Sequence, residues 1–131
     1  MTPSAPSNRP SPSRIASFRY ALSGMWHVLS TQPNARIHAT ATVCAVALGA
    51  WLGLSSAEWA ILALTVGLVW IAEFINTALE AMVDLASPDL HPLAKVSKDV
   101  SAAAVLVSAI ISVVVGLLVL GPPLWVRLFG G

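Results

Sequence analysis

The chain has 131 residues, of which 56% are hydrophobic and only 10% are charged, and its formal net charge is +1. A soluble domain carries about 25% charged residues, because its whole surface faces water. The composition therefore excludes a disordered regulator, a secreted disulfide scaffold and a soluble enzyme, and it indicates a small polytopic membrane protein. The single cysteine, Cys44, lies in an apolar stretch and excludes an internal disulfide.

The N-terminal residues 1–13 contain four prolines and four serines and no apolar stretch. This composition predicts a disordered tail and lacks the apolar region of a cleaved signal peptide. We expect the membrane domain to comprise residues 14–131. From Arg14 to Ser30 apolar residues recur at helical spacing, which predicts an amphipathic helix lying on the membrane surface. A helix packed on a protein core is the alternative.

Three apolar stretches follow, over about residues 37–54, 57–83 and 101–120. An α-helix needs roughly 20 such residues to cross the hydrocarbon core. The sequence thus predicts an all-α integral membrane protein with three transmembrane helices preceded by the amphipathic surface helix. Six of the seven Lys and Arg residues precede the first span or lie between the second and third. The positive-inside rule then places the N-terminus in the cytoplasm and the C-terminus outside.

The end of the second span carries polar side chains on one helix face: Glu73, Asn76, Thr77, Glu80 and Asp84. Charged groups at membrane depth normally face a bundle interior or water, and they mark functional sites. This face lies near the cytoplasmic edge of the membrane, which favours a site that a water-soluble substrate and a lipid headgroup can both reach. Alternatively, the carboxylates only cap a helix that protrudes into the cytoplasm.

The segment between the second and third spans contains Pro88 and Pro92, which predict a tight connection between antiparallel helices. Lys95 and Lys98 then come close to the carboxylates of the second span. Carboxylates for a divalent cation, lysines for phosphate and a carboxylate base form a plausible set for phosphoryl transfer. The alternative role for the lysines is a positive-inside anchor. No Walker A or GxGxxG motif occurs, which excludes the common nucleotide-binding folds.

Three motifs together resemble the prokaryotic diacylglycerol kinase family, which includes the undecaprenol kinases. They are NxRIH before the first span, ExxNTAxExxVD in the second, and PLAKxxKDxxAAAVL at the third. The resemblance covers about residues 17–120, and the first and last motifs are more similar to the undecaprenol-kinase branch. It implies an integral-membrane lipid kinase of the bacterial cytoplasmic membrane that uses ATP and Mg²⁺. It also implies a homotrimer with sites between neighbouring chains.

The resemblance further implies roles for single residues. Glu73 matches the catalytic carboxylate that takes the proton from the lipid hydroxyl, and Asn76 matches a residue that orients the base or the substrate. Glu80 matches the carboxylate that binds the magnesium of ATP. Further nucleotide contacts are implied for Tyr20, Asp89, Leu90, His91, Lys98 and Asp99, and Asp84 matches a polar site residue.

Two positions before the first span belong to the same implied site. Arg36 is expected to meet the lipid or its incoming phosphate. Gln32 stands where the family commonly has a second metal-binding Glu. An amide oxygen can bind magnesium, but it adds no charge to hold the ion. We still expect an active enzyme, because Glu73 and Glu80 are both present.

The leading hypothesis is a lipid kinase that transfers the γ-phosphoryl group of ATP to diacylglycerol or undecaprenol, giving phosphatidic acid or undecaprenyl phosphate. The alternative is a small oligomeric transporter or proton conductor that uses Glu73 and Glu80. Such a pathway needs polar residues up to the outer face, and residues 59–72 supply almost none. A structural membrane subunit leaves the Lys98–Asp99 pair without a role. No nucleic-acid partner is expected.

Overall fold

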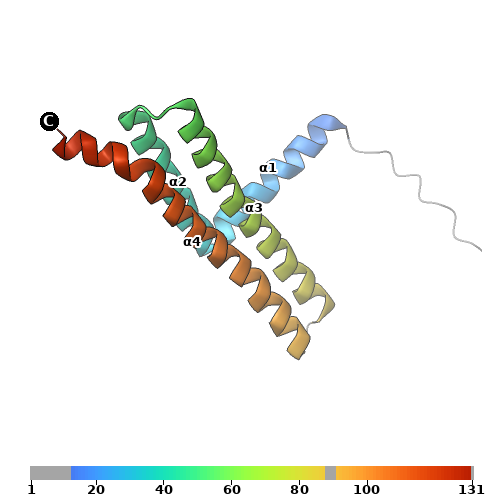
Figure 1. Ribbon diagram of the computed structural model, residues 1–131. Coiled ribbons are helices and arrows are strands. Elements are labelled where there is room, and N and C mark those ends of the chain that lie inside the picture. Colours follow the sequence, from blue (N-terminus) through green and yellow to red (C-terminus); the bar gives the residue numbers. More distant parts are fainter. Residues whose placement is uncertain (1–12, 88–90, 131) are drawn as a thin grey trace, which may run out of the picture.

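The computed structural model describes residues 13–87 and 91–130, and this part of the chain forms four α-helices. These are α1 (Arg14–Thr31), α2 (Pro33–Leu52), α3 (Ser56–Ala86) and α4 (Pro92–Phe129). The last three run beside one another, while α1 projects away from them (Figure 1). Each of α2, α3 and α4 is long and apolar enough to cross a membrane. The predicted all-α class with three apolar helices is confirmed. The predicted tail, apart from its last residue, lies outside the described residues.

The junction between α1 and α2 is a single non-helical residue, Gln32. Pro33 follows at the first position of α2, where the missing N–H group costs no hydrogen bond. The guanidinium of Arg36 donates hydrogen bonds back to the carbonyl oxygens of Leu29 and Ser30. These bonds satisfy acceptors at the end of α1 that have no partner within the helix. The first turn of α2 is therefore tied to the last turn of α1.

At the opposite end of the bundle a tight connection joins α2 to α3. Gly53 has a φ of 73°, a left-handed conformation that glycine adopts without a steric penalty. Ser55 and Glu58 then form a reciprocal capping box at the start of α3. A Cβ atom on Gly49 would lie 3.2 Å from the Trp59 ring, so the lack of a side chain lets that ring pack closely on α2.

The start of α4 differs from the prediction. The helix begins at Pro92, so Lys95, Lys98 and Asp99, which precede the predicted third span, are already helical. His91 caps this end, because its Nδ1 accepts a hydrogen bond from the backbone N–H of Leu93 at 3.2 Å. Pro92 was predicted to lie in the connection between the spans, and it stands at the first helical position, where proline is favoured. At its other end α4 continues to Phe129, beyond the predicted span.

The helices pack mainly through the antiparallel hairpin of α3 and α4 (Figure 1). Helix α2 contacts both members of the hairpin, and α1 contacts α2 and α3. Few apolar side chains are buried, and most large ones on all four helices are exposed. Extended exposed apolar surface marks contact with a membrane or with another protein chain. The packing therefore fits helices whose outer surface does not face water.

Candidate functional site

The buried polar side chains come from α3 and α4: Glu73, Asn76, Thr77, Ser101 and Ser108. Glu73 is only 1% exposed and is the largest fully buried side chain among the described residues. Burying a carboxylate costs free energy unless donors or a cation compensate it. The burial of Glu73 beside the other polar groups therefore marks this part of α3, and the part of α4 that faces it, as the candidate site.

A chain of hydrogen bonds connects the α1–α2 junction to α3 and α4. Glu80 accepts from the side-chain amides of Gln32 and Asn76, each at 3.2 Å. Asn76 in turn accepts from the hydroxyl of Ser101 at 2.7 Å. We call Gln32, Asn76, Glu80 and Ser101 the polar cluster. The structure thus brings together Gln32 and Glu80, the two residues expected to bind metal. Ser101 was not predicted, although it follows Lys98 by one helical turn.

Glu73 faces α2. Its Oε2 atom lies 4.0 Å from Nε2 of His38, and both atoms are buried. Neither atom has a hydrogen-bond partner among the residues that the structure describes. His38 had no predicted role beyond its place in the NxRIH motif. The sequence did contain an indication of a role: His38 has an ionisable ring inside the first apolar stretch, and such a ring needs a polar partner there.

Two ion pairs lie where α3 ends and α4 begins. Lys98 pairs with Asp84 across the hairpin, and Lys95 pairs with Asp99 one turn further along α4. Exposed ion pairs of this kind stabilise a fold by roughly 0–1 kcal/mol, so an anionic ligand can displace them. Lys98 and Asp99, the two residues expected to bind the nucleotide, are neighbours in α4, but each forms an ion pair with a different residue.

The remaining predicted site residues lie outside this hydrogen-bonded chain. Tyr20 is exposed on α1, and Arg36 binds the carbonyl oxygens at the end of that helix. His91 caps α4. Asp89 and Leu90 lie outside the described residues, so the structure does not position them.

Of Gln32 and Glu80, the two residues expected to bind a metal ion, only Glu80 carries a carboxylate. In the described ranges, no three His, Cys, Asp or Glu side chains lie close enough together to hold an ion. Magnesium, however, is usually bound by one or two carboxylates together with substrate phosphates. Glu80 offers two oxygens, and Gln32 and Asn76 can present amide oxygens after rotation of the terminal amide. This donor set fits magnesium carried by a nucleotide.

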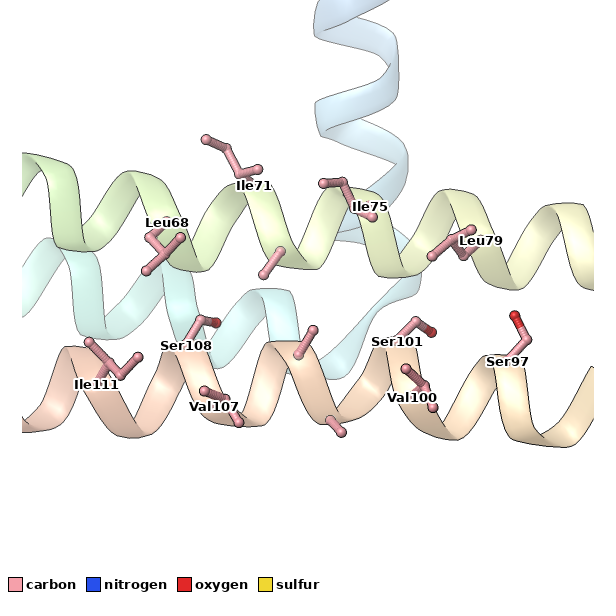
Figure 2. A pocket seen from close by; sticks show the side chains of 13 residues that line it. Leu68, Ile71, Ile75, Leu79, Ser97, Val100, Ser101, Val107, Ser108 and Ile111 are labelled. Atoms are coloured by element: carbon pink, nitrogen blue, oxygen red, sulfur yellow. The ribbon is translucent and has the colours of Figure 1, made fainter.

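An apolar groove of about 940 Å³ runs along the hairpin of α3 and α4. Figure 2 shows its lining, with Leu68, Ile71, Ile75 and Leu79 on α3 and Val100, Val107 and Ile111 on α4. The hydroxyl groups of Ser97, Ser101 and Ser108 are its main polar features. Because Ser101 belongs to both, the groove and the polar cluster are contiguous.

Three apolar helices of membrane length, with a buried carboxylate and a polar cluster at one end, define a polytopic α-helical membrane protein with a site between its helices. The family model described as prokaryotic diacylglycerol kinase matches residues 19–120. The chain belongs to this family, as its motifs indicated, and it is a bacterial membrane protein.

The curated relatives carry two names. A diacylglycerol kinase of Synechocystis is 46% identical over 114 residues, which are 86% of this chain and 65% of that protein. The undecaprenol kinase of Bacillus subtilis is 42% identical over 82% of this chain and 88% of its own length. The diacylglycerol kinase of Escherichia coli K12 is 32% identical over 72% of this chain and 78% of its own length. These relatives are kinases, so the transporter or proton-conductor alternative is not supported.

Proposed function

We propose that this protein is an ATP-dependent lipid kinase that phosphorylates the hydroxyl group of a membrane lipid, diacylglycerol or undecaprenol. The observation that carries the proposal is the buried Glu73, which shares a face of α3 with Asn76 and Glu80 of the polar cluster. Membership of the family and the names of the relatives support the same activity.

In the proposed reaction Glu73 is the general base. The O–H bond of the lipid hydroxyl breaks, and its proton passes to the Glu73 carboxylate. The oxygen forms a bond to the γ-phosphorus while the bond from that phosphorus to the β–γ bridging oxygen breaks, and ADP leaves. Because Glu73 is 1% exposed, bulk water is kept from the base and competes poorly as the phosphoryl acceptor. Asn76 holds Glu80 through its side-chain amide.

The polar cluster and the adjacent lysine form the proposed nucleotide side. Glu80 and Gln32 would hold Mg²⁺, which neutralises charge on the phosphates. Lys98 would exchange its contact with Asp84 for a phosphate oxygen. The further contacts carried over from the resemblance are Tyr20, Asp89, Leu90, His91 and Asp99 for the nucleotide and Arg36 for the lipid.

The apolar groove supports an acceptor with a long hydrocarbon chain. Its lining is almost entirely apolar, and it adjoins the polar cluster at Ser101. The distribution of Lys and Arg supports a cytoplasmic N-terminus and an outer C-terminus, which gives this site access to cytoplasmic ATP. The family resemblance supports a homotrimer in which neighbouring chains complete each site.

Phosphate transfer from labelled ATP in mixed micelles tests the proposal. Diacylglycerol and undecaprenol are offered separately to the wild type, to Glu73→Gln and to Glu58→Gln. We expect label in one lipid from the wild type and from the Glu58 variant, whose carboxylate caps the other end of α3. The Glu73 variant should fold normally and transfer no label. Absence of label in both lipids from folded, assembled wild-type protein refutes the proposal.

A further inference from the structure

His38 and Glu73 form a buried pair with unsatisfied facing atoms. His38 lies in the second turn of α2, and its side chain is 15% exposed, against 1% for Glu73. The 4.0 Å between Nε2 and Oε2 exceeds the upper limit of about 3.2 Å for an N–H···O hydrogen bond. Both atoms are buried and lack a partner among the described residues. The two atoms therefore face each other slightly too far apart for a hydrogen bond.

Two donors close to Glu73 along α3 are already engaged. The amide of Asn76 donates to Glu80, and the hydroxyl of Thr77 donates to the backbone carbonyl of Glu73 itself. Within the described part of the chain, His38 is the basic side chain that lies within 4.0 Å of the Glu73 carboxylate. An ionised carboxylate oxygen buried without a donor is unfavourable, so the imidazole N–H is the group able to compensate it.

We propose that His38 is a positioning residue for Glu73. When the substrates bind, Nε2–H closes on Oε2, holds the carboxylate in its ionised form and leaves Oε1 to accept the proton of the lipid hydroxyl. This inference rests on the proposed kinase function and adds to it a residue that acts through the base. Hydrogen bonds of catalytic groups are often long before substrate binds and tighten in the reactive complex. His38 keeps its own proton throughout the transfer.

Substitutions at His38 separate hydrogen bonding from packing. His38→Leu keeps similar volume without a donor, whereas His38→Gln retains an N–H group at similar reach. Thr42→Val is the matched control, because the Thr42 hydroxyl accepts a hydrogen bond from Trp70 at 3.3 Å and donates to the backbone carbonyl of His38 rather than to its ring. We expect His38→Leu to lower kcat by about 10- to 100-fold, the effect of losing a hydrogen bond to a charged group. The KM values for ATP and lipid should change less than about twofold by the same reasoning.

The glutamine variant should recover most of the lost kcat, and the Thr42 control should keep the wild-type kcat. A wild-type kcat in His38→Leu would overturn the proposal. Equal losses in the leucine and glutamine variants would also overturn it, since packing would then explain both.

A second measurement is independent of turnover. The ¹⁵N resonances of the His38 imidazole should shift in Glu73→Gln and stay unchanged in Glu58→Gln. If the wild type phosphorylated neither lipid, the kinase proposal would fail, while this shift would still decide whether His38 responds to Glu73. Unchanged His38 resonances in Glu73→Gln would overturn the inference even in an active kinase.

Discussion

Replacing Gln32 by Glu tests whether the α1–α2 junction belongs to the metal site. In the structure the Gln32 amide donates to Oε2 of Glu80 at 3.2 Å, and both side chains are half-buried. The substitution removes this hydrogen bond and places a second carboxylate at the same position. We therefore expect a protein that is less stable without magnesium and more responsive to it.

The magnitude follows from the geometry. Two unit charges 3.2 Å apart repel by about 5 kcal/mol at an effective dielectric constant of about 20. Because both residues are partly exposed, the carboxylates can move apart, and most of this repulsion is relieved. The lost hydrogen bond to a charged group remains and costs about 1.5–3 kcal/mol. The free energy of unfolding without magnesium should fall by about 2–3 kcal/mol in total.

Thermal unfolding in detergent, with chelator and with excess Mg²⁺, measures the change in stability. Initial rates measured against the Mg²⁺ concentration give the response to magnesium. We expect Gln32→Glu to lower the half-saturating Mg²⁺ concentration by about tenfold, which corresponds to about 1.4 kcal/mol. Glu80→Gln should instead raise it sharply. The double variant that combines Gln32→Glu with Glu80→Gln again places an amide beside a carboxylate, and it should regain most of the lost stability.

Gln32→Leu separates the two contributions, because it removes the hydrogen bond without adding charge. It should lose stability and show no rescue by Mg²⁺. If Gln32→Glu unfolded like the wild type in chelator and had the same Mg²⁺ dependence, position 32 would have no contact with Glu80 and no part in metal binding.

Two further substitutions test side chains at the start of α4. Lys98→Met should raise the KM for ATP by roughly tenfold and change the unfolding free energy by less than about 1 kcal/mol, because the pair with Asp84 is exposed. An unchanged KM in initial-rate measurements would remove Lys98 from the nucleotide site. Ser101→Ala leaves the buried acceptor of Asn76 unsatisfied and should cost about 1–3 kcal/mol in thermal unfolding. Ser108→Ala is its control, since that hydroxyl donates only to its own helix in the described structure, and equal losses would contradict the argument.

Hydropathy predicted the apolar helices well but not their polar ends. The first helix, expected from Arg14 to Ser30, is observed as Arg14–Thr31. The third apolar stretch was expected from residue 101, whereas α4 already begins at Pro92. The apolar signal reports only the part of a helix that suits hydrocarbon, and the first turns of α4 carry charged residues. A proline at the first helical position was the available indication that the helix begins earlier.

Spacing along α3 placed Glu73, Asn76 and Glu80 on one face, because the helical repeat alone fixes that relation. Their partners on other helices could not be found in this way. His38 lies near Glu73, and Ser101 donates to Asn76, because α2 and α4 are each rotated about their own axes so that these side chains face α3. That rotation is set by packing, and a single sequence does not specify it. Gln32 and Glu80 were paired by resemblance rather than by any property of their spacing.

The single-residue junction at Gln32 also couples α1 directly to the bundle of α2, α3 and α4. Gln32 stands at the C-cap position of α1 and at the N-cap position of α2, and its side-chain amide donates to Glu80. One inserted residue would leave both helices intact and yet carry the amide away from the carboxylate. A tilt of α1 relative to α2 would likewise act through this one residue on the position of its amide beside Glu80. Helix α1 is therefore coupled to the site, and its orientation relative to the bundle affects the geometry of the polar cluster.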